Sequence, residues 1–555
     1  MYLILIVCAA LIASGCSDEH VEESVQAPTD GESASWSPSR TNQDEPSSSP
    51  VASSTGAGTL TPAQVLNRAS IDIRGRRPSR DEFNRLATSP ERLDEMLDEF
   101  LDDPGFPDSV ADLFSRALRN RSDSYQGVDD EAGPGQTSTY QQSAADEPLM
   151  LIRHIVKNEL SYDEFLEADY TFANHDLASL WHMTGYDAQT GGWQRVRYAD
   201  DRPAAGFLSQ TSPFLRFVNN DGNFNRGRAN AMSRILLCSD FLKIPVDFPR
   251  DLDLSDENAI DNAISTNVAC TSCHTQLDPI ASFFSVYPEP DADNGEVGIR
   301  YRPDNAEDWI ENTGKRPAFY GREGNDLADL ARFIREDSRY LRCAVSRVYE
   351  GLLDRPATSD DSAAITQHLE AFEEGGRTFT ALYRSVLSDP LYRGRNQDAR
   401  SATGAKMLSP ELLQRVVTHL TGFHAKIEGV DIMRHEEGLR ILGGGLSAFS
   451  GDYPSRTANV TRVLVHGRLA EAAALYVVTQ SNAQAETLVA DMDVAPSSSD
   501  IERLFQTILG RGPTPQDLSD FNELFEMIQD ESGDFQLAHA ALISVLLRDP
   551  EFIIY

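Results

Sequence analysis

The sequence predicts a mostly α-helical protein built from repeated helical hairpins, with few or no strands. Helix-start signals recur along the chain. Residues 61–64 (TPAQ) offer a capping Thr, a proline at the first helical position and a capping-box Gln, and residues 409–412 (SPEL) repeat part of this logic. No stretch sustains the alternation of apolar and polar residues that a half-buried strand requires.

A pattern that occurs three times strengthens this prediction. Each copy has a turn with Gly or Asp, Arg and Pro, then Ser or Thr with an acidic residue, an amphipathic helix and a closing Asp-Pro-x-aromatic sequence. The copies span residues 75–106, 354–392 and 510–552. Glycine permits a left-handed helix end, Ser or Thr caps the next helix, and the Asp-Pro pair stops the last one. We therefore expect three helical hairpins with a packing role.

The N-terminus has the features of an export signal. Residues 3–13 (LILIVCAALIA) form an apolar run too short to span a bilayer, and Ala13-Ser14-Gly15-Cys16 follows it closely. This ending resembles the lipobox of bacterial lipoproteins, in which the cysteine becomes the lipidated N-terminus, and Ser17 after it favours the outer membrane. Residues 1–16 would then be a lipoprotein signal peptide. Because this segment has no Lys or Arg, an ordinary signal peptide or an N-terminal anchor remains the alternative.

Composition divides the remainder into a tether and three helical regions. Residues 17–59 are rich in Ser, Pro, Thr and acidic residues, which predicts a disordered tether. The helical regions span residues 60–147, 148–395 and 396–555. The chain has 87 acidic and 49 basic residues and a net charge of -38. A nucleic-acid partner is therefore not expected, whereas a cationic protein partner, or plain solubility in a salty compartment, fits the charge.

The strongest chemical signal is the sequence Cys270-Thr271-Ser272-Cys273-His274. Two thiols three residues apart can add to the two vinyl groups of haem, and the adjacent His can bind the iron. A redox disulfide and half of a zinc site are the alternatives. A zinc site needs a second ligand pair and a thioredoxin-like site needs a βαβ context. The motif therefore predicts one covalently bound haem c.

The residues around this motif extend the interpretation. Residues 267–280 (NVACTSCHTQLDPI), 160–178 (LSYDEFLEADYTFANHDLA) and 408–422 (LSPELLQRVVTHLTG) resemble segments of planctomycete-type c-type cytochrome lipoproteins, a family of ill-defined function. Trp181-His182 departs from the Tyr-Gly that relatives usually have. The resemblance implies a haem and a location in the bacterial cell envelope, but it implies no named reaction.

The remaining haem contacts are open at the level of the sequence. No Met follows the motif until Met407, so the candidates for the second iron ligand lie upstream: Met232, His182, His175 and Met183. A five-coordinate iron is the alternative. Arg226 and Arg228 are candidates to pair with the haem propionates, because guanidinium groups match carboxylates. A solvated or capping role is the alternative for both.

We expect the haem pocket to be shared between regions. Pro279 should end the helix that carries Cys270 after about two turns. The ADYTFAN segment (168–174) and the residues around Met232 would supply the other wall. A self-contained cytochrome domain from about 250 to 350 is the alternative, although about 100 residues would suffice for one.

Two cysteines are left over, Cys238 and Cys343. An even pair in an oxidising compartment predicts a disulfide, with two separate buried thiols as the alternative.

Together these features predict an exported, membrane-tethered mono-haem cytochrome on the outer membrane or cell surface. It would pass electrons to a secreted or envelope protein. The alternatives are a haem enzyme or sensor with an open iron position, and a helical scaffold protein of the cell surface. The sequence assigns no catalytic residues.

Overall fold

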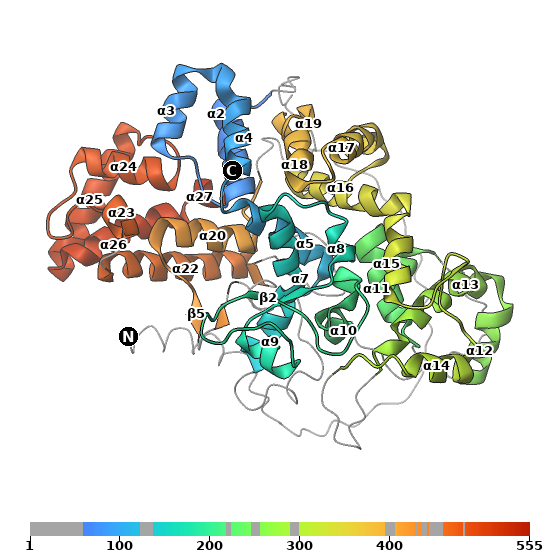
Figure 1. Cartoon of the computed structure of the whole chain (residues 1–555). Coiled ribbons are helices and arrows are strands. Elements are labelled where there is room, and N and C mark those ends of the chain that lie inside the picture. Colours follow the sequence, from blue (N-terminus) through green and yellow to red (C-terminus); the bar gives the residue numbers. More distant parts are fainter. Residues whose placement is uncertain are drawn as a thin grey trace, which may run out of the picture. The chain divides into compact units, whose positions relative to one another are not determined.

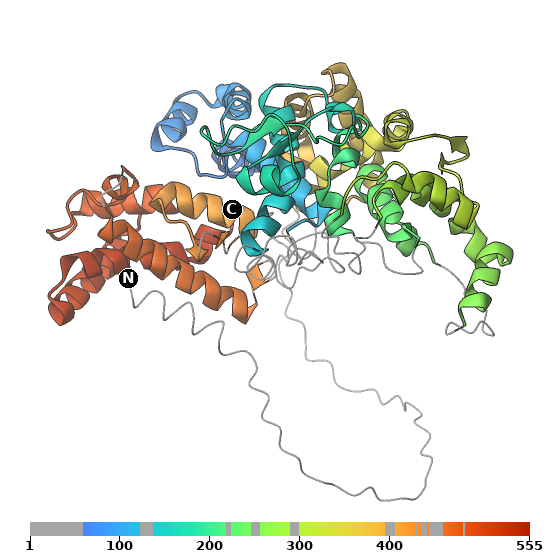
Figure 2. The same ribbon diagram turned by 60° about the horizontal axis from the view of Figure 1, so that its bottom comes forward.

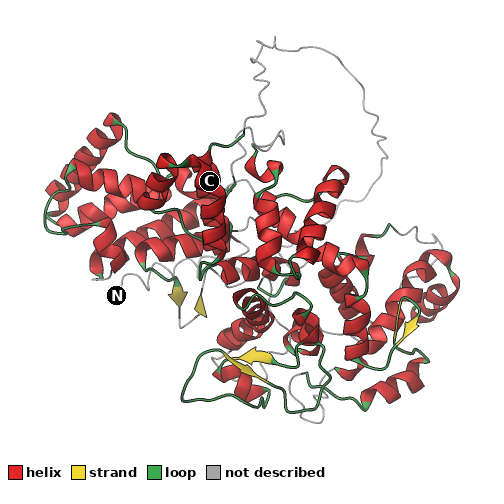
Figure 3. Cartoon of the chain, turned by 45° about the horizontal axis from the view of Figure 1, so that its top comes forward, coloured by secondary structure: helices red, strands yellow, loops and turns green. Residues whose placement is uncertain are grey.

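The computed structural model describes residues 59–121, 137–217, 224–245, 256–288, 299–394, 406–427, 430–431, 433, 441–442, 459–480 and 483–555. Helices dominate this part of the chain, which confirms the predicted fold class (Figure 3). Three short antiparallel pairs of strands are also present: β1 (Thr171–Ala173) with β2 (Gln194–Val196), β3 (Ala318–Phe319) with β4 (Arg322–Glu323), and β5 (Lys426–Ile427) with β6 (Val430–Asp431). The predicted signal peptide, Cys16 and residues 17–58 lie outside the described residues.

The first helix, α2 (Pro62–Arg74), begins as the sequence predicted. The Thr61 hydroxyl accepts a hydrogen bond from the Gln64 backbone at 3.3 Å, and the Gln64 side chain accepts one from the Thr61 backbone at 2.9 Å. Thr59 already pairs with Gly394 in an antiparallel bridge. This residue therefore belongs to the fold, whereas the sequence placed it in the tether.

The helices are labelled in Figure 1. The helices that follow α2 are α3 (Arg80–Thr88), η1 (Pro90–Arg92), α4 (Leu93–Leu101), α5 (Phe106–Leu118), α7 (Thr137–Lys157), α8 (Glu164–Glu167) and α9 (His175–Leu180). The next are η2 (Gly206–Ser209), α10 (Ser212–Arg216), α11 (Arg226–Leu237), η3 (Phe241–Lys243), α12 (Glu257–Thr266), α13 (Val268–Ser282), η4 (Phe283–Val286) and α14 (Asn305–Thr313).

The next helices include the one that carries Cys343 and those of the second repeat. They are α15 (Leu327–Arg335), α16 (Ser338–Leu353), η6 (Ser359–Asp361), α17 (Ser362–Glu374), α18 (Phe379–Leu387) and α19 (Pro390–Arg393). The C-terminal region contains α20 (Pro410–Thr421), α22 (Val460–Thr479), α23 (Ala483–Leu488), α24 (Ser498–Ile508), α25 (Pro515–Ser532), α26 (Phe535–Arg548) and α27 (Pro550–Ile553). In this region α22 packs along α26, and the orange and red helices form one bundle (Figure 2).

Two hydrophobic cores hold these helices together. The first contains buried side chains from Val65 to Tyr392, and the second contains Ile71 and buried side chains from Leu408 to Phe552. The predicted division at 147/148 falls inside α7, which contributes to the first core on both sides of it. The first two helical regions therefore share one core, whereas the second core is built from residues after 407 together with Ile71 of α2.

The three repeats have the same turn geometry. Their turn residues adopt left-handed conformations, with φ of 66° at Gly75, 52° at Asp354 and 74° at Gly510. In each copy a Ser or Thr four residues later forms a capping box with an acid: Ser79 with Glu82, Thr358 with Asp361 and Thr514 with Asp517. The repeat found in the sequence is therefore a repeat of local structure.

The closing Asp-Pro-x-aromatic sequences also share a role. In the second and third copies Asp389 and Asp549 cap one-turn helices, α19 and α27, that begin with the proline. The closing aromatic side chains are almost fully buried in all three copies: Phe106, Tyr392 and Phe552. Each hairpin thus ends by inserting a ring into a core.

The capping acid of the second repeat should make the fold sensitive to acid. Hydrogen bonds from Arg355, at 2.7 Å to each carboxylate oxygen, hold the pKa of Asp361 well below its ordinary value, although burial acts in the opposite direction. The unfolded chain binds this proton more readily, so stability falls as the pH drops below about 4. We expect Asp361→Asn to cost about 1–3 kcal/mol at pH 7 and to weaken the acid dependence.

Urea unfolding followed by circular dichroism between pH 7 and pH 3 checks this expectation. Asp517→Asn is the matched control, because Asp517 holds the same place in the third repeat but its side chain is 28% exposed. A smaller loss is expected there. Equal acid dependence in the Asp361→Asn variant and the unchanged protein would contradict the assignment.

A buried ion pair connects α2 to distant parts of the chain. One carboxylate oxygen of Asp72 lies 2.5 Å from Lys406 Nζ and accepts a hydrogen bond from the Tyr392 hydroxyl at 2.8 Å. The other oxygen accepts from the Tyr555 hydroxyl at 2.7 Å. Lys406 and Tyr555 also exchange backbone hydrogen bonds of 2.7 and 2.8 Å. Burial lowers the pKa of Lys406, and the charge of Asp72 opposes this shift.

Candidate cofactor site

The Cys-x-x-Cys-His motif lies on the first turns of α13. The Asn267 side chain caps this helix by accepting a hydrogen bond from the Ala269 backbone at 2.9 Å. Cys270 and Cys273 are free and partly exposed, and His274 follows directly. Since residues three and four apart lie on one face of a helix, both thiols and the imidazole are presented together. Helices α11 and α12 and strand β3 pack against α13, and the three helices lie together in Figure 1.

The helix continues past Pro279, so the prediction that Asp278-Pro279 ends it was wrong. α13 has 15 residues and runs to Ser282, with Pro279 inside it. Its last turn packs into the first core, where Ile280 and Ala281 are buried, and the Ser282 hydroxyl donates to the Asp278 carbonyl at 3.1 Å. This packing outweighs the hydrogen bond that the proline cannot make.

Asp278 lies at the centre of the site, one helical turn after His274. The Nδ1 atom of His274 is 3.0 Å from one oxygen of Asp278, and Arg226 donates to both oxygens at 2.8 and 3.2 Å. Lys315 donates to the second oxygen. We call His274, Asp278, Arg226 and Lys315 the Asp278 cluster.

The charges of the Asp278 cluster fix the tautomer of His274. Burial raises the pKa of Asp278, but the hydrogen bonds from His274, Arg226 and Lys315 outweigh it and hold the pKa well below its ordinary value. An ionised carboxylate accepts a hydrogen bond from Nδ1–H, and in the neutral imidazole Nε2 then keeps the lone pair that a metal ion requires. This is the arrangement in which metal-binding histidines are usually held.

One aromatic ring, that of Phe224, lies beside the cations of the cluster. The ring centre of Phe224 is 5.3 Å from the Arg226 guanidinium carbon and 6.0 Å from Lys315 Nζ. It is also 6.1 Å from the centre of the Trp309 ring, whose nitrogen donates to the Ser282 hydroxyl at 3.0 Å. Phe224 is 39% exposed. The site therefore offers an apolar surface next to two positive charges.

The two arginines that the sequence singled out have different surroundings. The Arg226 side chain is 14% exposed and pairs with Asp278. Arg228 is buried, and its guanidinium donates to the Phe217 carbonyl at 2.9 Å, to the Asn225 side chain at 2.9 Å and to the Tyr287 carbonyl. A contact between Arg228 and a propionate would require breaking these hydrogen bonds. Arg228 therefore has a packing role at the start of α11.

The candidates for the second iron ligand fall into two groups. Met232 is buried on α11, which packs against α13. His175 and Met183 lie at the start of α9 and just after its end, and His182 lies between them in the chain. The main packing partners of α9 are α7 and β1. Of these candidates, only Met232 lies on a helix that packs against the helix of His274 as one of its main partners.

The neighbours of the motif come partly from the upstream region. α11 and Arg226 come from the upstream region and lie outside the window from 250 to 350 that a self-contained domain would occupy. The ADYTFAN segment, by contrast, forms β1, whose main packing partners are α7, β2 and α9. Sequence reasoning also missed Asp278 and Lys315. The spacing of four residues between His274 and Asp278 could have revealed the first, whereas nothing local points to Lys315.

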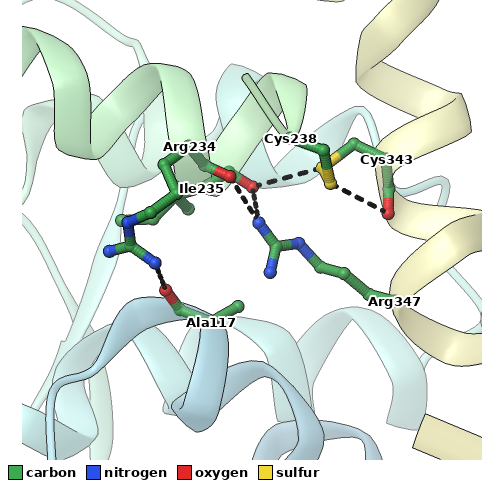
Figure 4. The surroundings of a disulfide bond; sticks show 6 residues. All are labelled: Ala117, Arg234, Ile235, Cys238, Cys343 and Arg347. Atoms are coloured by element: carbon green, nitrogen blue, oxygen red, sulfur yellow. Dashed lines mark hydrogen bonds between the residues drawn. A yellow bond between two sulfur atoms is a disulfide. The ribbon is translucent and has the colours of Figure 1, made fainter. Parts of the chain in front are cut away.

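Cys238 and Cys343 form a disulfide in the structure, with Cα atoms 5.3 Å apart. It joins the end of α11 to α16, as Figure 4 shows. Next to it, the Arg347 guanidinium donates to the backbone carbonyls of Arg234 and Ile235 at 2.6 and 2.8 Å, which satisfies carbonyls in the last turn of α11. The disulfide encloses a loop that contains the whole motif.

Removal of this disulfide should destabilise the fold. Its cysteines are 105 residues apart, and closing a loop of about this length restricts the unfolded chain strongly. We expect Cys238→Ser with Cys343→Ser to cost about 2–5 kcal/mol in free energy of unfolding. Urea unfolding of the haem-free protein measures this loss. Cys270→Ser with Cys273→Ser is the matched control and should leave the urea midpoint unchanged, whereas similar midpoints for both pairs would refute the assignment.

Two kinds of feature are absent from the described residues. No group of three or more His, Cys, Asp or Glu side chains in the described ranges converges as ligands of one metal ion. Nor does this part of the chain contain a helix with the length and apolar character needed to cross a membrane.

Comparison with known proteins gives one match. A family model described as PSD4, a protein of unknown function (DUF1592), matches residues 82–183. This is less than a fifth of the 555 residues; it covers the ADYTFAN segment and ends before Cys270. No curated protein and no solved structure matches the chain. The match agrees with the resemblance noted for the upstream segment and does not extend to the motif.

Proposed function

We propose that this protein is an exported, membrane-tethered mono-haem c-type cytochrome that transfers electrons in the bacterial cell envelope. The observation that carries the proposal is the arrangement on α13. Two free thiols and His274 share one helix face, and Asp278 holds the imidazole with Nε2 available. These are the groups that covalent haem attachment and iron binding require.

The surroundings of α13 fit a haem. Cys270 and Cys273 would form the thioether bonds and His274 would bind the iron, which supplies a one-electron couple when present. Arg226 and Lys315 lie beside the imidazole and both donate to Asp278, so next to a bound haem they would hold this carboxylate rather than a propionate. Phe224 and Trp309 add apolar surface beside these charges.

Features of the sequence support the proposed location and partner. Lipidation of Cys16 would anchor the chain in the outer membrane, with residues 17–58 between the anchor and the folded part. The net charge of -38 suits a cationic envelope or secreted protein as the electron partner. Mass spectrometry of the mature N-terminus tests the anchor, because a free N-terminus at any other residue means ordinary cleavage.

The decisive experiment is production of the full chain together with a c-type maturation system. Haem staining in a denaturing gel should show a covalent haem, and the reduced spectrum should not change when carbon monoxide is added. A carbon monoxide shift would instead indicate an open iron position and favour the haem enzyme or sensor. A colourless protein that binds zinc would overturn the proposal.

A further inference from the structure

We infer that Asp278 is a positioning residue that sets the reduction potential of the site, and that Lys315 adjusts its effect. The inference rests on the proposed function, because it concerns a haem bound through His274. It is carried by the Asp278 cluster, in which one buried carboxylate contacts the imidazole and two cations at once.

The first step is the orientation of the imidazole. Asp278 lies four residues after His274 on the same helix, and the 3.0 Å contact to Nδ1 fixes the plane and tautomer of the ring. A carboxylate that accepts a hydrogen bond from Nδ1–H increases the electron density on the ring. A more strongly donating ligand stabilises the oxidised iron and thus lowers the reduction potential.

The second step is control of Asp278 by its other partners. The Asp278 side chain is 8% exposed, so its charge is little screened by water. Arg226 and Lys315 donate hydrogen bonds to the same carboxylate as His274. They therefore set the strength of the hydrogen bond that Asp278 accepts from Nδ1. They come from α11 and from the segment after α14, so the cluster joins three parts of the chain.

The two cations differ in accessibility. The Arg226 side chain is 14% exposed and lies at the start of α11, whereas the Lys315 side chain is 34% exposed. Arg226 therefore has the more fixed role, and Lys315 is the group that solvent ions can reach. Without Lys315, the second oxygen of Asp278 loses a charged partner. The carboxylate then accepts a stronger hydrogen bond from Nδ1 of His274.

The test uses the haem-loaded full chain and measures the midpoint potential by redox titration. Asp278→Asn should keep the covalent haem, because the thioether bonds use Cys270 and Cys273, and should shift the potential upward. Lys315→Met should shift it downward. Asp308→Asn is the matched control, since it removes an exposed carboxylate on α14, and it should leave the potential nearly unchanged.

A double variant separates the inference from a simple effect of charge. If Lys315 acts through Asp278, Lys315→Met should have little effect in a chain that already carries Asp278→Asn, whereas independent charges would give additive shifts. The exchangeable Nδ1 proton of His274, observed by nuclear magnetic resonance, should also exchange faster in the Asp278→Asn variant.

The outcomes are distinguishable from failure of the proposed function. An unchanged protein without covalent haem overturns the proposed function itself. Covalent haem with equal potentials in the unchanged protein and the Asp278→Asn variant overturns only the inference, as do additive shifts in the double variant. If Asp278→Asn does not yield loaded protein, Lys315→Met decides, because an unchanged potential there also overturns the inference.

Discussion

Replacement of both Cys270 and Cys273 by alanine is expected to abolish covalent haem completely. Each thioether bond uses one of these thiols, and both are free on the exposed part of α13. The variant, produced with the c-type maturation system, should give no haem stain after denaturation. Each single variant should retain one thioether bond and therefore some stain, because one thiol remains to react.

Cys238→Ala with Cys343→Ala is the control for this prediction. These cysteines form the disulfide and are not next to a histidine, so the variant should keep its haem even though its fold is less stable. If the Cys270→Ala, Cys273→Ala variant keeps a haem stain after denaturation, the haem is attached at another residue and the prediction is wrong.

Asp72→Ala is expected to cause the largest loss of stability. The substitution leaves Lys406 buried without its carboxylate partner and removes the acceptor for the hydroxyls of Tyr392 and Tyr555. Breaking a buried ion pair in this way costs about 3–5 kcal/mol. Urea or thermal unfolding of the full chain measures the loss.

Two comparisons define the source of this loss. Asp72→Leu combined with Lys406→Met should be less destabilising than Asp72→Ala, because it removes both charges together. Glu551→Gln, which breaks the exposed ion pair with Arg511, should cost less than about 1 kcal/mol. A loss for Asp72→Ala as small as that for Glu551→Gln would mean that the buried pair contributes little.

Much of the fold could be predicted because its signals are local. The capping boxes at Thr61 and in the three repeats need only residues three apart, and left-handed turn residues were expected where Gly occurs. The strands were harder to predict. β1 has three residues, too few for an alternating pattern to stand out, and its partner β2 lies beyond α9 in the chain.

The errors came from contacts between distant residues. Pro279 should end a helix by its local preference, but burial of Ile280 and Ala281 keeps α13 intact. Likewise, the thiols and the histidine of the motif are visible in five residues, whereas Lys315 reaches Asp278 from 37 residues away. No spacing rule anticipates such a contact, so the sequence showed the motif but not the side chains that contact it.

The ion pair of Asp72 has a consequence for how the protein is made. Residue 72 leaves the ribosome well before residue 555, which follows 483 positions later. At a synthesis rate of about 5–20 residues per second, the delay is roughly half a minute or more. Lys406 follows Asp72 by 334 positions and Tyr555 follows it by 483, so the carboxylate on α2 lacks both partners at first and lacks Tyr555 until the end of this delay. The hydrogen bonds and the ion pair of Asp72 are therefore complete only after residue 555 has been made.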